Sequence, residues 1–173
     1  SAFPEVVFAE KIMRHMHEYG MTGEPIICDF KAKDGTAIVR LTGYSLSDEA
    51  DELDLFISLY SGTDEILPIP DSETTKAAQH CLRFIASCVK GNLSKKMDPS
   101  HEAFELVVTI ENAYEALGQI RVFVITDRKA KTKVFKDREI AGKNIKLQVM
   151  DVERLFNHLQ EGRPRDELVI EFP

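Results

Sequence analysis

The sequence predicts an α/β fold built on a mixed β-sheet. Short β-rich runs between residues 24 and 60, separated by turn residues, indicate strands joined by hairpins. Apolar residues at helical spacing flank these runs and indicate helices. A third observation is IRVFVIT at 120–126, which is apolar on both faces and is typical of a central strand covered on both sides. Because strands and helices alternate, parallel and antiparallel pairs are expected in one sheet.

The first half of the chain is expected to form a helix followed by a three-stranded antiparallel meander. Gly20 and Gly23 end the helix. Asp34-Gly35 is a strong hairpin signal between the first two strands, and the acidic segment 47–52 forms the next turn. The expected elements are a helix at 3–19 and strands at 24–31, 36–46 and 53–60.

The second half is expected to add two helices, a central strand and a β-α-β extension. Pro68 and Pro70 are expected to interrupt regular secondary structure. Asp71 or Ser72 is expected to cap the helix that follows. Asp151 is placed to cap the last helix. The expected elements are helices at 71–90 and 100–117, a strand at 120–126, a basic loop at 128–138, a strand at 144–150, a helix at 152–160 and a strand at 166–172.

This order of elements matches the core of restriction-endonuclease-like folds, in which a helix, a three-strand meander, a helix and a strand follow one another. A C-terminal β-α-β extension would be added to that core. The 173 residues suffice for one domain with a sizeable core, and we expect a single nuclease-like domain over 1–173. The chain begins Ser-Ala without a methionine and stops just after the strand-like LVIEFP, so we expect a domain excised from a longer protein.

Composition is ordinary for a soluble globular protein, at 43% hydrophobic and 29% charged residues. The longest apolar runs fall far short of the roughly 20 residues that a membrane helix needs, and no signal peptide opens the chain. Cys28, Cys81 and Cys88 suit a reducing compartment, and the last two are expected on a buried helix face. We therefore expect a cytoplasmic protein without a membrane partner.

Charge is unevenly distributed along the chain, whose net charge is −7. Residues 44–73 hold nine acids and no lysine or arginine, whereas residues 128–146 hold eight basic residues against two acids. This pattern excludes a uniformly basic nucleic-acid binder, but it leaves a basic loop suited to phosphate or to an acidic protein surface. The candidate binding residues in that loop are Arg128, Lys129, Lys131, Lys133 and Lys136.

The order and spacing of five short segments indicate a resemblance to a known family. They are Gly43-Tyr44, Tyr60-Ser61-Gly62, Thr126-Asp127-Arg128, Asp151-Val152-Glu153-Arg154-Leu155 and Ile170-Glu171-Phe172. With these segments the chain resembles, over roughly residues 3–172, the N-terminal domain of the abortive infection phage resistance (AIPR) family. The resemblance implies a bacterial phage-defence protein whose N-terminal domain has a nuclease-like fold.

Nucleases of that fold hold a hard divalent cation with acids on the hairpin strands, and a lysine orients the attacking water. Some members of the resembled family carry Gln, any residue, then Lys, followed by an aromatic residue. Matched on Tyr60, that triple falls on Ile57-Ser58-Leu59, and the upstream acid position falls near Ser45. Strand alternation places Ile57 and Leu59 on one face with Leu53 and Leu55, so the catalytic face has become aliphatic. We therefore expect no catalytic residue, metal or other cofactor there.

The first hypothesis is a non-catalytic, nuclease-like regulatory or interaction domain, which docks its own C-terminal region or another protein. An alternative is a metal-dependent nuclease with a relocated Mg²⁺ site built from Asp29, Asp54 and Asp127. Asp127 follows the central strand, a common site location in α/β sheets. A further alternative is a nucleic-acid binding module that uses residues 128–138 without cutting, and its binding would weaken as salt rises.

Overall fold

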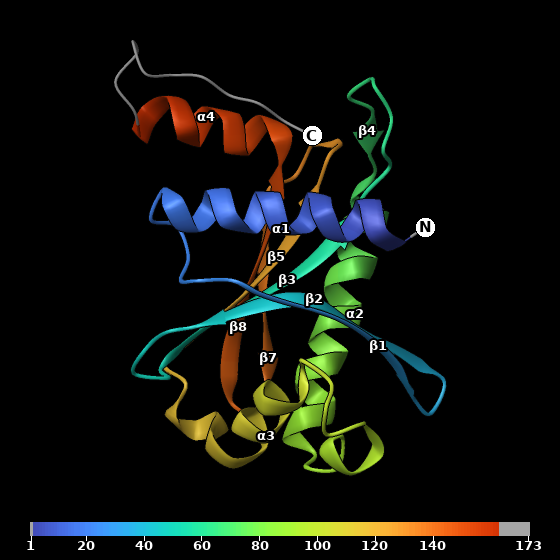
Figure 1. The fold of residues 1–173 in the computed structure, drawn as a ribbon, viewed down its shortest axis with the longest axis vertical. Coiled ribbons are helices and arrows are strands. Elements are labelled where there is room, and N and C mark those ends of the chain that lie inside the picture. The colour runs from blue at the N-terminus through green and yellow to red at the C-terminus, as the bar shows by residue number, and fades with distance from the viewer. Residues whose placement is uncertain (1, 163–173) are drawn as a thin grey trace.

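A six-stranded mixed sheet forms the centre of the molecule, in the strand order β1-β2-β3-β5-β8-β7 (Figure 1). The structure, a computed structural model, describes residues 2–162. Its strands are β1 (Ile26–Asp34), β2 (Ala37–Leu46), β3 (Glu52–Leu59), β5 (Gln119–Thr126), β7 (Val134–Ile140) and β8 (Lys143–Asp151), and a second sheet pairs β4 (Pro68–Ile69) with β6 (Lys129–Ala130). Its helices are α1 (Ala2–Glu18), α2 (Asp71–Val89), α3 (Phe104–Ala113) and α4 (Val152–Gly162), with short 3₁₀ turns η1 (Ser94–Lys96) and η2 (Tyr114–Ala116).

The predicted α/β class with a mixed sheet is confirmed. Strands β1, β2 and β3 form the predicted antiparallel meander. Strand β3 then pairs in parallel with β5, and β5 in parallel with β8, whereas β7 pairs antiparallel with β8. IRVFVIT is therefore a central strand, β5, with a parallel neighbour on each side. The carboxyl ends of β3, β5 and β8 consequently lie at the same end of the sheet.

Helices cover both faces of the sheet (Figure 1). Helices α2 and α3 pack on one face, in an apolar cluster that contains Phe84, Ile85, Leu106, Leu55 and Val122. Helices α1 and α4 pack on the other face, in a cluster that contains Met13, Leu155, Phe56, Phe123 and Met150. Burial of both faces explains why the consecutive residues 122–125 of β5 are all apolar.

Strand β3 carries the aliphatic stripe that its sequence predicts. Leu53, Leu55 and Ile57 are at most 1% exposed in the cluster under α2, and Leu59 packs against that cluster. Phe56 belongs to the opposite cluster, under α1. Hydrocarbon therefore fills the α2-facing side of β3.

Close packing around residue 43 of β2 requires glycine there. A Cβ atom there would lie 2.7 Å from the carbonyl oxygen of Ile26 and 2.6 Å from the terminal methyl of Met13. The first contact is with backbone, so no side-chain rotation relieves it. Strand β1 and helix α1 thus approach β2 closely at one of the positions that carry the family resemblance.

The prediction of a loop at 128–138 is wrong, because these residues contain β6 and most of β7. Strands β7 and β8 form a hairpin through Ala141 and Gly142, whose φ angles of +48° and +84° suit a tight two-residue turn. The exposed residues of β7 show no apolar alternation, so strand periodicity gives no signal there.

One helix start and one helix cap also differ from the prediction. Helix α3 begins at Phe104 rather than residue 100, because Asp98 and His101 accept backbone N–H groups two residues ahead and hold turns there. Helix α2 has Pro70 as its N-cap, and Asp71 is already helical; its carboxylate accepts the hydroxyl of Thr132. The strand predicted at 166–172 lies outside the described residues.

All three cysteines are buried free thiols. Burial raises the pKa of Cys28 to about 12 and also raises the pKa of Cys81 and of Cys88. The predicted buried helix face for Cys81 and Cys88 is confirmed. Between residues 2 and 162, no helix combines the length and apolar content needed to cross a membrane.

Candidate functional site

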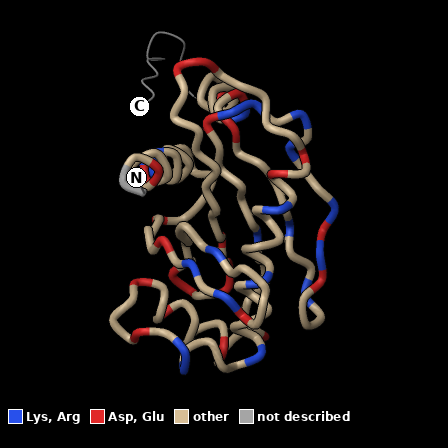
Figure 2. The backbone as a smooth tube through the Cα atoms, turned by 90° about the vertical axis from the view of Figure 1, so that its right-hand side faces the viewer, with Lys and Arg blue, Asp and Glu red and all other residues tan. Residues whose placement is uncertain are grey.

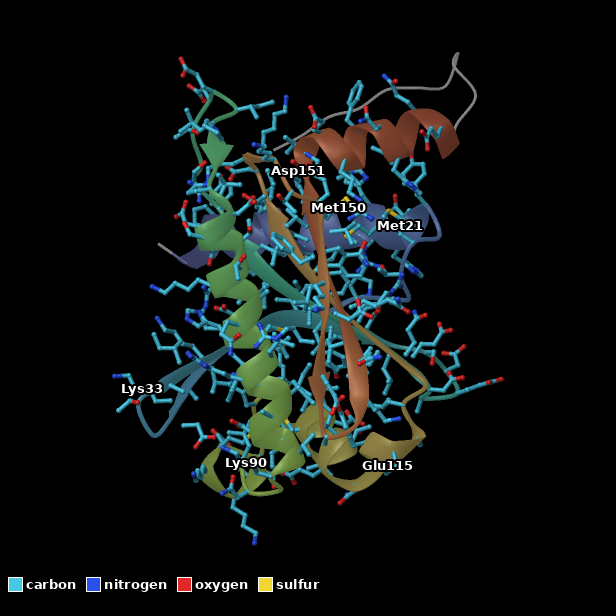
Figure 3. The ribbon with its side chains drawn as sticks, turned by 180° about the vertical axis from the view of Figure 1, so that it is seen from behind. Met21, Lys33, Lys90, Glu115, Met150 and Asp151 are labelled. Carbon is cyan, nitrogen blue, oxygen red and sulfur yellow. The ribbon has the colours of Figure 1, made fainter. Side chains whose placement is uncertain are left out.

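Three of the segments that carry the family resemblance meet at one end of the sheet. Tyr60-Ser61-Gly62 follows β3, Thr126-Asp127-Arg128 ends β5, and Asp151-Val152-Glu153-Arg154-Leu155 runs from β8 into α4. Because β3, β5 and β8 are parallel neighbours, these segments lie side by side. Figure 3 shows Met150 and Asp151 at this end, away from Lys90 and Glu115 at the other. Open α/β sheets commonly bind ligands at the carboxyl ends of their strands.

Asp127 fastens the chain that follows β3 to the end of β5. One carboxylate oxygen accepts the backbone N–H of Ser61 at 2.9 Å. The other accepts the N–H of Gly62 at 2.9 Å and the hydroxyl of Ser61 at 3.0 Å. Three donors occupy most of the lone pairs of this carboxylate. Asp127 therefore holds a turn and has little capacity left for a cation.

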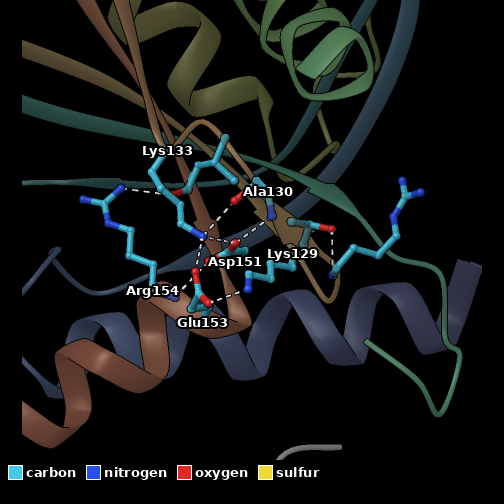
Figure 4. A network of polar contacts seen from close by, with 9 residues as sticks. Lys129, Ala130, Lys133, Asp151, Glu153 and Arg154 are labelled. Carbon is cyan, nitrogen blue, oxygen red and sulfur yellow. Dashed lines mark hydrogen bonds and ion pairs between the residues drawn. The ribbon is translucent and has the colours of Figure 1, made fainter. Parts of the chain in front are cut away.

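Asp151 is the centre of a second network (Figure 4). Its side chain is fully buried. One oxygen accepts the N–H of Arg154 at 2.8 Å, which is the helix cap predicted for this residue. The other accepts the N–H of Ala130 at 2.8 Å and the ammonium group of Lys133. The carboxylate thus ties α4 to β6 and to the segment that leads into β7.

Glu153, in the first turn of α4, completes this network. Its carboxylate lies 3.0 Å from the Nζ atom of Lys133 and 3.0 Å from that of Lys129. These bonds hold the pKa of Glu153 below its usual range. At Lys133, partial burial disfavours the charged form, but the bonds to Asp151 and Glu153 outweigh it and raise the pKa. Both groups are therefore ionised at neutral pH.

A groove of about 950 Å³ opens beside the network. Its lining combines the apolar side chains Phe8, Tyr60, Ile66, Val152 and Phe156 with the charged side chains Asp64, Asp127, Lys129 and Glu153. Ile66 is 65% exposed and Phe156 39% exposed. Exposed apolar side chains gathered in one place mark interaction sites more often than scattered ones do. With three acids and one lysine, the lining favours an apolar group accompanied by positive charge.

The structure divides the five predicted binding residues into two groups. Three of them pair with acids: Arg128 with Glu73, Lys129 with Glu153, and Lys133 with Asp151 and Glu153. Lys131 and Lys136 have no acidic partner among residues 2–162. Internal acids therefore neutralise three of these five residues.

The three acids of the alternative metal site are not brought together. Asp54 is buried in β3 and forms a two-bond pair with Arg121 of β5, at 2.7 and 2.9 Å. Asp54 lies near the start of β3 and Asp127 just beyond the end of its neighbour β5, so about 20 Å separates them along the strands. Asp29 lies in a bulge of β1, with a φ angle of +40°. In the described part of the chain, no group of three His, Cys, Asp or Glu side chains is placed to hold a metal ion.

Sequence reasoning missed Glu153 and the groove, and it identified Asp151 only as a helix cap. The link from Asp151 to Ala130 and Lys133 spans 18 to 21 residues. No local spacing encodes such a link. The sequence did contain one signal. Two acids flank Val152, at positions 151 and 153, and three lysines alternate at positions 129, 131 and 133. Unlike charges at adjacent strand ends attract one another.

The N-terminal domain of abortive infection phage resistance proteins matches residues 8–157 of the chain. The matched range covers the six-stranded sheet and the residues of both carboxylate networks. No curated protein and no solved structure matches the chain. The resemblance predicted from the sequence is confirmed, and the chain belongs to the abortive infection phage resistance family as a form of its N-terminal domain.

Proposed function

We propose that this chain is a non-catalytic, nuclease-like interaction domain of a phage-defence protein. One observation carries the proposal: aliphatic side chains occupy the face of β3 on which a nuclease needs metal ligands. Ile57 occupies the Gln position of the family triple and is fully buried under α2, and Leu59 occupies the Lys position and packs against the same cluster. Mg²⁺ requires oxygen ligands, which neither side chain supplies.

The topology supports a restriction-endonuclease-like core. Helix α1, the β1-β2-β3 meander, helix α2 and strand β5 follow one another in that order, and β5 lies parallel to β3. Strand β8 and helix α4 would belong to the C-terminal extension. Because one fold hosts many functions, the functional argument rests on side chains rather than on topology.

The proposed docking site is the groove beside the Asp151 network. Its proposed occupant is a protein segment that carries an apolar side chain next to a basic one. The exposed side chains of Ile66 and Phe156, next to the partly buried ring of Tyr60, suit the apolar group. Asp64 has no partner among the described residues and suits the basic group. The segment belongs to the remainder of the same protein or to a second protein.

Nucleic acid is a weaker candidate partner. Phosphate binding needs lysines and arginines that are free to replace counterions. In the segment 128–138 the charges of Arg128, Lys129 and Lys133 are already paired with acids. A partner that competed for them would have to break these internal pairs.

A photo-crosslinking amino acid at position 156 of the full-length protein tests the docking proposal. Phe156 is partly exposed on the groove, so replacing its ring with benzophenone leaves the fold intact. The expected result is one dominant crosslink to a segment with adjacent apolar and basic residues. Mass spectrometry of the crosslinked peptide then decides whether it comes from the same chain or from another protein.

The matched control carries the same crosslinker at Ile26. This residue is 44% exposed and lies on β1, away from the groove. Crosslinking at position 156 that is no stronger or more specific than at position 26 would contradict the docking proposal.

A further inference from the structure

A cleft of about 480 Å³ lies where the start of β1 and the end of β2 meet helix α3, and we call it the α3 cleft. It shares no lining residue with the groove beside the Asp151 network, so the two sites are separate. Its apolar lining includes Ile26, Leu46 and Leu106. This volume is within the range of small-molecule sites, about 300–1,000 Å³.

Tyr44 lines the α3 cleft with a hydroxyl group that has no partner among residues 2–162. The residue is only 5% exposed, and a buried hydroxyl normally forms a hydrogen bond because burial without one is costly. Burial, and then neighbouring groups that include Cys28 and Glu105, raise the pKa of Tyr44, so the hydroxyl keeps its proton at neutral pH. A neutral hydroxyl can accept a hydrogen bond from a ligand. Tyr44 belongs to the Gly43-Tyr44 segment of the family resemblance, and the close packing of Gly43 does not account for it.

Three acids from separate elements also line the α3 cleft. Glu24 precedes β1, Asp48 follows β2, and Glu105 lies in the first turn of α3. None of them forms an ion pair or a side-chain hydrogen bond with a described residue, and the lining contains no lysine or arginine. Residues 44–73, which include Asp48, hold nine acids and no basic residue, so only acidic colouring appears along this stretch in Figure 2. Uncompensated negative charge beside apolar side chains favours a cation with an apolar body.

The arrangement of these acids suits an extended cation rather than a compact one. In the part of the chain that the structure describes, no three acidic, histidine or cysteine side chains are placed to share a metal ion. Charges spread over three elements instead match a ligand whose positive groups are also spread out. In a linear polyamine, short hydrocarbon segments separate the ammonium groups. These segments can lie on Leu46 and Leu106 while the ammonium groups remain beside the acids.

We propose that the α3 cleft binds a linear aliphatic polyamine. Its ammonium groups face Glu24, Asp48 and Glu105, and one of them donates a hydrogen bond to the hydroxyl of Tyr44. The ligand is a small molecule, so this site is additional to the protein-docking groove.

Calorimetric titration of the 173-residue chain with spermidine tests the proposal. Saturable binding is expected, and salt should weaken it because the acids are exposed. Tyr44→Phe removes a hydroxyl that binds nothing within the described protein, so the urea midpoint should stay unchanged while spermidine binding weakens about tenfold. Glu105→Gln should weaken binding about threefold, as expected for one exposed ion pair.

Two controls separate this site from general attraction between a polyamine and an acidic protein. Glu10→Gln makes the same change of charge on an exposed residue of α1 outside the cleft, and it should leave the affinity unchanged. N-acetyl-lysine amide carries a single ammonium group and should bind about tenfold more weakly than spermidine, or less tightly still. No saturable binding up to millimolar spermidine overturns the proposal, as does an affinity that Tyr44→Phe leaves unchanged or that Glu10→Gln lowers as much as Glu105→Gln. Equal affinity for the lysine derivative also overturns it, because the cleft would then suit a basic side chain of a protein.

Discussion

Replacing Asp151 with alanine should destabilise the domain far more than a typical substitution. The side chain is fully buried and accepts hydrogen bonds from the N–H groups of Arg154 and Ala130 and from Lys133. Loss of a helix cap costs about 1 kcal/mol. Leaving the N–H of Ala130 buried without a partner costs about 1–3 kcal/mol, and Lys133 loses its one fully buried partner.

Together these losses lower the free energy of unfolding by about 4 kcal/mol. For a domain of this size, about 4 kcal/mol corresponds to a fall of about 8–16 °C in Tm. Urea unfolding followed by far-UV circular dichroism measures the free energy directly. The urea midpoint should fall without a change in slope, because the extent of the folded structure is unchanged.

Glu153→Gln is the matched control for this prediction. Glu153 pairs with the same lysine but is 41% exposed, so solvent screens its ion pairs and its removal should have a much smaller effect. If Asp151→Ala proves no more destabilising than Glu153→Gln, the buried carboxylate does not hold α4 and the 129–133 segment together. The structural reasoning for this end of the sheet would then be refuted.

Three further predictions concern packing, pH and salt. Gly43→Ala should cost about 2 kcal/mol or more, because its Cβ would lie 2.7 Å from a backbone oxygen of β1, whereas Gly118→Ala, with 3.6 Å of room, should be tolerated in the same urea assay. Burial and neighbouring cations lower the pKa of His80 in the folded state, so its contribution to stability is full above about pH 6.5 and falls as pH decreases. The wild-type free energy of unfolding relative to that of His80→Gln should therefore fall between pH 7.5 and 5, by at most about 1.4 kcal/mol per pH unit; no fall would contradict the assignment. If only Lys131, Lys136 and Arg138 of the segment 128–138 are free to contact phosphate, the slope of log K against log salt for DNA binding should be no steeper than about −3. A slope near −5 would contradict the internal pairing of the other basic residues.

The sheet could be predicted largely because its strands carry local signals. Asp34-Gly35 marked the first hairpin, and the aliphatic alternation of 53–59 marked both a strand and the face that it buries. Asp151 was recognisable as a cap because the residue type and its place before a helix are both local.

The missed features depend on contacts between distant residues. Strand β7 is held by backbone pairing with β8 while most of its side chains face solvent, so apolar periodicity does not mark it. The lysines at 129 and 133 looked free in sequence, and Glu153 of α4 pairs with both only once the fold brings α4 beside them. Burial of charge is a property of the tertiary structure, which composition does not reveal.

The central proposal is that this domain, which we infer to be nuclease-like, does not cut nucleic acid. Calorimetric titration of the domain with Mg²⁺ and Mn²⁺, with a cleavage assay on labelled DNA and RNA run in parallel, tests it most directly. The expected result is no saturable metal binding and no metal-dependent cleavage, because Ile57 and Leu59 occupy the positions of the family triple. Saturable binding together with metal-dependent cleavage that Asp54→Asn or Asp127→Asn abolishes would contradict the claim.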